Sequence, residues 1–425
     1  MVQDLKRNMT GKLVTNEYLF LLILFLLASF LRIVYAFYLK ENIPVADAAE
    51  FDLLGLNVLK YGEYAFQPGI PTAQRTPIYP LFLSGIYFLF GHSYLAVRIM
   101  QSIIGSLTCI VIYLIGKKTV NKNVGFIAAT ISIFYPFFIY YTGYLLVETL
   151  FTFLLAVAVY WLITSIEKPD WKNLTLSGVF MGLAALCKPT AFAFIPFSVL
   201  GFLVILGIRK VSTYRNIGIF LLFFTITLSP WVIRNHIVFQ RIIPATTQLG
   251  FALLDGSLLF DAEHQWRIEQ EEQKNPILLK GKELNEIEQN DYFTKEALKF
   301  IRNNPKYMMK LALRKFLKFW RLYPHTESIY TYKYSKTLLV LVSLLSYGLL
   351  LLFSIVGIIF SIRKWRQFAF FYGLIVSFTI IHLLFWSQIR YRLPIMPYMI
   401  VFAAFGLNFI IERMKSLRLA KRVKI

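Results

Sequence analysis

The carboxylates that could do chemistry in this chain stand beside long apolar segments. Asp47 and Glu50 lie in the stretch Pro44-Val45-Ala46-Asp47-Ala48-Ala49-Glu50-Phe51, and Glu148 is the only carboxylate between Glu63 and Glu167. A charge held at a membrane is costly unless it is partnered or has a function. Asp47 is suited to act as a general base on an acceptor hydroxyl, and Glu148 to act with it by orienting an acceptor or a divalent cation.

Both carboxylates also have a structural interpretation. Asp47 and Glu50 have the spacing of a capping box at the start of a helix that runs to about Tyr61. Such a helix would place Phe51 and residues 54, 58 and 61 on one face, which predicts that it lies flat on the membrane. The structural alternative for Glu148 is a tie to an Arg or a Tyr that holds the fold together.

Four arginines are predicted at the same membrane level as these carboxylates. An arginine at the end of a span often snorkels to lipid headgroups. Snorkelling does not explain four arginines on the side of the membrane that normally carries few cations. A guanidinium can form a bidentate pair with a phosphate. We therefore predict a site for a lipid-borne phosphate or an acceptor, formed by Glu50, Arg75, Arg234, Asn235, Arg390, Tyr391 and Arg392.

The composition predicts that these residues are positioned by helices within a membrane. Of the 425 residues, 57% are hydrophobic and only 16% are charged, whereas soluble chains carry about 25% charged residues. The net charge of +22 comes from short clusters between apolar stretches rather than from one basic face, so we expect no nucleic acid partner. Cys109 and Cys187 both lie inside apolar runs, which excludes a secreted disulfide scaffold.

The sequence predicts an all-α polytopic membrane protein with about ten spans. Ile78 to Phe90 is too short to span and is predicted to be a peripheral or re-entrant helix. The predicted spans are Tyr18 to Leu39, Tyr94 to Gly116, Val124 to Tyr141, Leu145 to Ile166, Leu174 to Leu186, Thr190 to Ile208, Ile217 to Ile233, Thr337 to Phe360, Phe368 to Trp386 and Ile395 to Ile411.

The basic clusters set the predicted orientation, with both termini cytoplasmic. Two segments then lie outside: the first loop, 40–77, and a helical loop, 234–336. Within the second we expect a helix from Lys282 to Asn303 and an interfacial helix from Lys306 to Arg321, with Lys310, Arg314 and Lys318 on one stripe. A basic tail, 412–425, follows the last span, and we place the single membrane domain, 1–425, in a bacterial cytoplasmic membrane.

Motifs of several enzyme classes are missing. The sequence has no Walker A loop, dinucleotide fingerprint, Gly-x-Ser-x-Gly motif or Cys/His metal spacing. Arg32 and Arg98 lie closer to span interiors and are expected to be structural.

In their order along the chain, several segments resemble the GT-C superfamily of integral-membrane glycosyltransferases. The group in question is similar to dolichyl-phosphate-mannose protein mannosyltransferases and to the lipid A aminoarabinose transferase (glycosyltransferase family 39-like). The segments are Asp47 to Gly62, Arg75-Thr76-Pro77-Ile78-Tyr79-Pro80, Tyr144 to Glu148, Pro230-Trp231 with Arg234-Asn235, and Arg390-Tyr391-Arg392-Leu393-Pro394 with Pro397.

The resemblance implies a GT-C-like bundle with extracytoplasmic interfacial helices. It implies that Asp47 is the catalytic first-loop aspartate, and that Arg75, Arg390 and Arg392 face the donor's lipid phosphate. The donor would be a polyprenyl-phosphate sugar, and the acceptor an envelope lipid, glycan or protein. Asp47 would act as the base of an inverting single displacement. Many relatives carry an acidic residue where this chain has Ala48, so the resemblance leaves the use of a divalent cation open and names no other cofactor.

Two other functions fit a polytopic chain with charges near the membrane. A secondary transporter or lipid flippase would also use such charges, but it typically shows inverted repeats and spans broken near the midplane. A noncatalytic assembly partner in the cell envelope would need no base at position 47.

Overall fold

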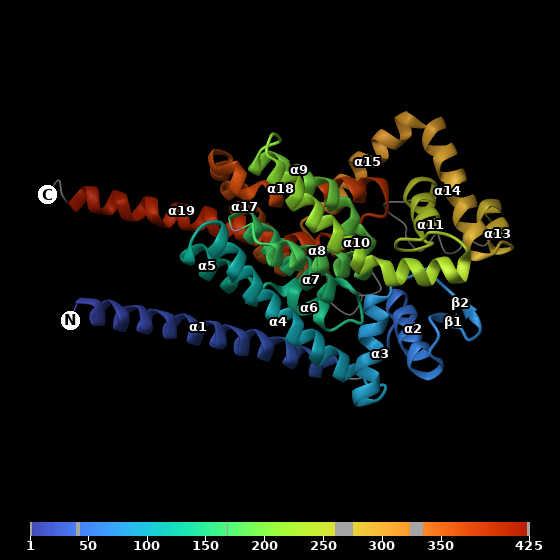
Figure 1. The fold of residues 1–425 in the computed structure, drawn as a ribbon, viewed down its shortest axis with the longest axis horizontal. Coiled ribbons are helices and arrows are strands. Elements are labelled where there is room, and N and C mark those ends of the chain that lie inside the picture. The colour runs from blue at the N-terminus through green and yellow to red at the C-terminus, as the bar shows by residue number, and fades with distance from the viewer. Residues whose placement is uncertain (1, 40–42, 168, 260–274, 324–334, 423–425) are drawn as a thin grey trace.

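The computed structural model describes residues 2–39, 43–167, 169–259, 275–323 and 335–422, with side chains from residue 17 to residue 417. Within these ranges the chain is helical except for one hairpin, in which β1 (Ala65–Gln67) pairs antiparallel with β2 (Ile70–Pro71). The molecule is elongated (Figure 1). The N- and C-terminal helices project from one end, while the helices of the two predicted external loops gather at the other.

The described residues contain seven helical stretches long and apolar enough to span a membrane, or eight if one bent pair is counted as a span. The bent pair is α5 (Lys122–Phe134) with α6 (Pro136–Thr142), and the two helices meet at 53°. Pro136 explains the bend because it cannot donate a backbone hydrogen bond to the preceding turn. The seven are α1 (Val2–Leu39, of which Glu17–Leu39 is apolar), α4 (Tyr94–Thr119), α7 (Glu148–Glu167), η1–α9 (Pro189–Leu206), α10 (Val211–Phe239), Lys336–Leu384, and η5–α19 (Ile389–Arg422, of which Ile389–Leu417 is the span).

Three of the ten predicted spans are not counted separately among these stretches. The predicted span Leu174 to Leu186 corresponds to α8 (Trp171–Cys187), whose 17 residues fall short of the length of a span. The predicted spans Thr337 to Phe360 and Phe368 to Trp386 lie in one helical run of 49 residues. At 1.5 Å per residue a straight helix of that length would be more than twice as long as the bilayer core is thick.

The 49-residue run is folded back on itself. It consists of α16 (Lys336–Ser343), η3 (Leu344–Gly348), α17 (Leu349–Ser361), η4 (Ile362–Lys364) and α18 (Trp365–Leu384). The Ser361 and Tyr372 hydroxyls are hydrogen-bonded across η4, although eleven residues of a straight helix would hold them about 16 Å apart. α17 packs against α19, whereas α18 packs against α9 and α15 (Pro305–Phe319). The chain therefore reverses at η4, and the two segments stay separate as predicted.

The first loop forms α2 (Asp47–Tyr61), the hairpin and α3 (Ile78–Phe90). The sequence predicts that the apolar face of α2 lies on the membrane, but this face packs against α3. Phe51 and Leu54 are 6% and 0% exposed, and a Cβ on Gly55 would meet the Leu83 Cβ at 2.9 Å. Tyr61, at the end of α2, is exposed. α3 has the predicted bounds and, at 13 residues, is too short to span.

The second external segment contains α11 (Leu249–Leu254), η2 (Asp255–Leu259), α13 (Pro276–Lys282), α14 (Glu286–Asn303) and α15. The predicted helix from Lys282 begins instead at Glu286, because Asn285 and Glu288 form a capping box there. In α15, Lys310 and Arg314 are exposed beside exposed apolar side chains such as Met309 and Leu313, which is consistent with the predicted interfacial helix.

The core surrounds α7 and α19, which are the most buried of the spanning helices. α19 approaches α17 so closely that a Cβ on Gly357 would lie 1.9 Å from the Phe402 carbonyl oxygen. Arg32 and Arg98 are buried and donate to the backbone carbonyls of Ser132 and Gly143. These contacts confirm that both arginines hold spanning helices together.

Candidate active site

Asp47 is the first residue of α2, and its carboxylate is directed away from the helix backbone. Ala46 stands at the N-cap with a φ of 51°, a left-handed conformation that is unusual for alanine, and no side chain caps the helix. The predicted capping box between Asp47 and Glu50 is therefore wrong. The strained backbone at Ala46 leaves both carboxylates available to arginines instead.

Arg75 binds Asp47 and Glu50, the two carboxylates in the first turn of α2. Its Nη2 lies 3.0 Å from Asp47 Oδ1, and its Nε donates to Glu50 Oε2 at 2.7 Å. The guanidinium also lies over the Phe51 ring, 5.4 Å from the ring centre. Burial lowers the pKa of Arg75, but the charges of Asp47 and Glu50 outweigh burial and raise the pKa above its ordinary value. Arg75 is thus a permanent cation at this site.

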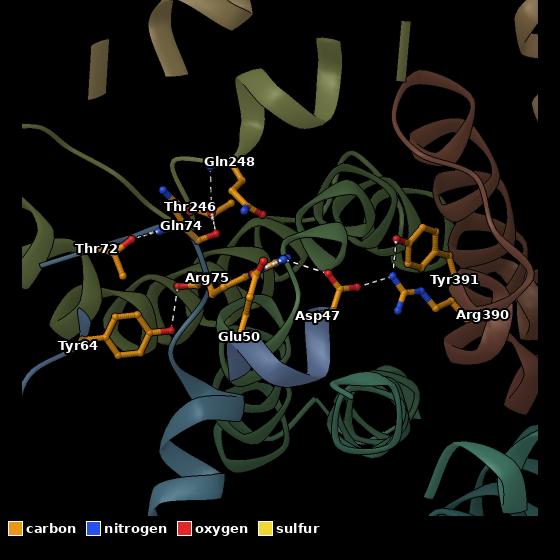
Figure 2. A network of polar contacts seen from close by, with 10 residues as sticks. All are labelled: Asp47, Glu50, Tyr64, Thr72, Gln74, Arg75, Thr246, Gln248, Arg390 and Tyr391. Atoms are coloured by element: carbon orange, nitrogen blue, oxygen red, sulfur yellow. Dashed lines mark hydrogen bonds and ion pairs between the residues drawn. The ribbon is translucent and has the colours of Figure 1, made fainter. Parts of the chain in front are cut away.

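Arg390 reaches the same aspartate from the opposite end of the sequence. Its Nη2 lies 2.5 Å from Asp47 Oδ2, so the carboxylate stands between two guanidiniums, as Figure 2 shows. Burial alone would raise the pKa of Asp47, but the charges of Arg390 and Arg75 outweigh it and lower the pKa from 3.8 to about 2. Asp47 is therefore an anion at neutral pH. The Tyr391 hydroxyl also accepts a hydrogen bond from Arg390 at 3.1 Å.

Glu148 extends the cluster into the bundle, together with a lysine that the sequence analysis missed. Glu148 is 1% exposed, and its Oε1 lies 3.1 Å from Lys188 Nζ and 3.9 Å from Arg390 Nε. Its Oε2 has no hydrogen-bond partner within the described ranges. Lys188 also lies over the Tyr391 ring at 4.3 Å. The sequence signal for this residue is a lysine directly before Pro189, two residues after the predicted span Leu174 to Leu186.

The site cluster, as we name it, contains three acids and three bases: Asp47, Glu50 and Glu148 with Arg75, Lys188 and Arg390. Its formal charge is zero. The carboxylates come from α2 and the start of α7, and the cations from three other segments, so residues up to 343 positions apart meet here.

Three predicted site residues lie elsewhere and hold the fold. Arg234 donates to the carbonyls of Thr72 and Tyr64, at 2.8 and 3.1 Å, and Asn235 donates to Ile243. Arg392 is 2% exposed, donates to the carbonyls of Phe319 and Arg321, and lies 3.6 Å from the centre of the Tyr347 ring. These contacts involve no member of the site cluster.

The segment before α3 is held in place by the second of the two predicted external loops, 234–336. Glu286 of α14 accepts hydrogen bonds from the Thr72 and Thr247 hydroxyls and from the Ala73 backbone. The Thr246 hydroxyl donates to the Gln74 carbonyl, and Tyr64 donates to the carbonyl of Arg75 (Figure 2). These bonds fix the backbone that carries Arg75, so the position of its guanidinium depends on a segment more than 170 residues away in the sequence.

No group of three or more His, Cys, Asp and Glu side chains in the described part of the chain is arranged to hold a metal ion. In the site cluster each carboxylate lies against a cation instead. Chemically, the arrangement offers cations for an anionic ligand and a carboxylate, Asp47, to accept a proton.

Comparison with known proteins gives one family match and several similar solved structures. Residues 74–233 match the family model described as dolichyl-phosphate-mannose-protein mannosyltransferase. Archaeal oligosaccharyltransferase AglB from Archaeoglobus fulgidus, in complex with an inhibitory peptide and a dolichol-phosphate, has a TM-score of 0.58 at 15% identity, over 96% of this chain and 52% of that one. The apo form of the Archaeoglobus fulgidus enzyme has a TM-score of 0.57 at 14% identity, over 95% of this chain and 52% of that one. ArnT from Cupriavidus metallidurans bound to undecaprenyl phosphate has a TM-score of 0.42 at 12% identity, over 91% of this chain and 77% of that one. No curated protein matches the sequence.

The structural likeness to AglB defines the class: the chain is an all-α polytopic membrane protein with the GT-C fold. The match over 74–233 confirms the resemblance to the mannosyltransferase group and relates the chain to the GT-C glycosyltransferases. The chain spans about half the length of the oligosaccharyltransferase it matches.

Proposed function

We propose that this protein is an inverting glycosyltransferase that moves a sugar from a polyprenyl-phosphate donor to an acceptor hydroxyl. One observation carries the proposal: Asp47 is held between Arg75 and Arg390 at the end of the bundle where the external helices gather. The AglB structure contains a dolichol-phosphate and a peptide, which supports a lipid-phosphate donor and an acceptor of the envelope kind for this chain.

The donor's phosphate would bind to the guanidiniums of Arg75 and Arg390. A charge-assisted hydrogen bond from a guanidinium stabilises the negative charge that remains on the phosphate when the glycosidic bond breaks. The acceptor oxygen attacks the anomeric carbon from the opposite face, and Asp47 takes its proton. The C–O bond to the phosphate breaks as the new glycosidic bond forms, so the anomeric configuration inverts.

Binding of the donor would also strengthen the base. With both guanidiniums on its carboxylate, Asp47 has a pKa of about 2 and is a weak base. When the phosphate competes for those guanidiniums, their effect on Asp47 weakens, and the burial that raises its pKa remains. Asp47 thus becomes a better proton acceptor once the donor is bound.

Glu148 and Lys188 would position Arg390 from the side of the site cluster that extends into the bundle. Glu148 lies between the lysine and the guanidinium, so it balances two cations that would otherwise repel each other. A divalent cation is not needed for this charge balance. Addition of a chelator followed by Mg²⁺ or Mn²⁺ in the transfer assay would test whether one takes part.

The experiment is transfer in proteoliposomes with a radiolabelled polyprenyl-phosphate sugar and a panel of envelope lipids, glycans and peptides. We expect a labelled product whose anomeric configuration is inverted relative to the donor. Labelled sugar that only crosses the bilayer would favour a transporter or flippase. The proposal would be refuted if the protein transferred sugar from a nucleotide sugar but not from any lipid-phosphate donor.

We further propose that the site faces away from the cytoplasm of a bacterial cell and that both termini are cytoplasmic. The support is that the termini and the short loops on the side opposite the site carry clusters of Lys and Arg. The long segment 234–336 is also basic, but long loops translocate largely regardless of charge. Labelling of single cysteines in intact cells tests this orientation. A cysteine at the exposed Gly69 of the hairpin should react with an impermeant maleimide, whereas one at Arg363 should react only after lysis.

A further inference from the structure

A cavity lined by polar and apolar side chains lies at the end of the bundle remote from the site cluster. It has a volume of about 220 Å³ and is formed by the last turns of α4, α7 and α9 and the first turn of α18. One water occupies about 30 Å³, so the cavity holds more than a single bridging solvent molecule. α7 separates it from Glu148 by most of its 20 residues, roughly 28 Å along the helix.

The polar lining includes a hydroxyl for which the protein provides no partner. Thr119 is 6% exposed, and its Oγ1 has no hydrogen-bond partner in the portion of the chain that the structure describes. A buried hydroxyl without a partner costs about 1–3 kcal/mol. Because Thr119 lines the cavity, a ligand there can supply the missing bond.

The charges around Thr119 favour an anion. Lys118 and Arg366 line the cavity with one carboxylate, Glu167, which lies 2.5 Å from the Lys118 ammonium. Arg366 and Gln367 are in the first turn of α18, where no side chain caps the helix, so the positive end of the helix dipole adds to the same field. The lining therefore has an excess of positive charge.

The remaining wall is apolar. It consists of Ile163, Ile166, Ile205 and Phe370, which belong to three different helices of the bundle. A polar, cationic end joined to an apolar wall at the end of spanning helices matches an amphiphile with an anionic head. Basic pockets of this kind between spanning helices bind phospholipid headgroups.

We propose that this cavity binds the headgroup of a phospholipid with a net negative charge, with Arg366, Lys118 and the Thr119 hydroxyl as the donors to its phosphate. The acyl chain of the lipid would lie along the isoleucines. The proposal does not depend on the glycosyltransferase activity, because the cavity shares no residue with the site cluster.

The test uses the full chain, purified in detergent and delipidated, with native mass spectrometry after addition of phosphatidylglycerol or phosphatidylcholine. We expect preferential retention of phosphatidylglycerol. Arg366→Gln should weaken retention about fivefold, the effect of one cation near a membrane surface. Thr119→Val should weaken retention similarly while leaving thermal stability unchanged or higher, because the lost hydroxyl has no protein partner.

Two further variants make the test specific. Glu167→Gln frees Lys118 from its ion pair and should strengthen retention, the opposite sign to Arg366→Gln. Lys364→Gln removes a charge from the same turn at a position outside the cavity lining and should have no effect. Competition by millimolar inorganic phosphate would show that the phosphate group alone is recognised, whereas resistance to it would show that the lipid's acyl chain also contributes. Both results uphold the site.

Equal retention of the two lipids would overturn the proposal. So would an Arg366→Gln variant that behaves like Lys364→Gln, since the lipid would then respond to surface charge in general.

Discussion

Replacement of Asp47 by Asn removes one charge from the site cluster and keeps the shape of the side chain. The pKa of Asp47 is about 2 in the fold against 3.8 for an ordinary aspartate, so the fold stabilises the anion by about 2 kcal/mol. A lowered pKa contributes stability above the unfolded pKa, and this contribution is lost as pH falls through the folded pKa. We expect Asp47→Asn to unfold more easily at pH 7, with a difference that disappears between pH 4 and pH 2.

The same substitution should separate catalysis from donor binding. Loss of a positioned general base typically costs 10²- to 10⁴-fold in rate, so kcat for sugar transfer should fall by about that factor. The cluster changes from neutral to a charge of +1, and Arg75 and Arg390 lose an anion that competes with the donor phosphate. KM for the donor should therefore stay the same or decrease. The assay is initial-rate transfer from a radiolabelled polyprenyl-phosphate sugar, with thermal unfolding followed in parallel.

Asp291→Asn is the matched control. Asp291 pairs with Arg241 at 2.8 Å in an exposed ion pair within the segment 234–336, away from the site cluster, and such pairs contribute about 0–1 kcal/mol. This variant should transfer sugar at the normal rate. Our reasoning would be refuted if Asp47→Asn kept a normal kcat, or if its donor KM rose as far as its kcat fell, because Asp47 would then serve binding rather than proton transfer.

Three further variants test the remaining contacts. Arg392→Gln leaves the carbonyls of Phe319 and Arg321 without their donor, so we expect a stability loss of about 2–3 kcal/mol in denaturant titrations and little change in donor KM. Ala46→Gly removes the strain of an alanine with a positive φ, so we expect it to stabilise the fold by about 1 kcal/mol and to raise the unfolding temperature. An unfolding temperature below that of the unmodified protein would contradict the strain. Lys188→Met leaves Glu148 as a buried anion and should cost about 3–5 kcal/mol, most of which the double variant with Glu148→Gln should recover if the ion pair is the cause.

Hydropathy predicted most of the membrane segments because a bilayer demands long apolar runs. It was less reliable where length alone decided. α8 ends at Cys187, after 17 residues, and is not counted as a span. Hydropathy also assigned the apolar face of α2 to lipid, although α3 covers it. A sequence reports that a face is buried but not which surface buries it.

Within the site, charge type at a predicted membrane level identified Asp47, Arg75 and Arg390. Charge type did not show that Arg390 belongs to the site cluster and Arg392 does not, because that distinction depends on the type of helix that carries them. Both residues lie in the 3₁₀ segment η5 (Ile389–Ile395), where residues two apart differ by about 240° around the axis. One arginine therefore reaches Asp47 while the other reaches the carbonyl of Phe319. Nor could the capping box be rejected from spacing, since the backbone angle of Ala46 decides it.

Predicted site residues that lie outside the site cluster still help to determine its geometry. Asp47 and Arg390 are 343 residues apart, so their 2.5 Å ion pair exists only if the first loop and η5 are both fixed relative to α7. Arg234 and Glu286 hold the first loop, and Arg392 holds η5 against the end of α15. A displacement of about 1 Å in either anchor can cost a reaction a factor of about 100. If the chain transfers sugar as proposed, we expect Arg234 and Arg392 to act as positioning residues, because they fix the two segments that carry Arg75 and Arg390.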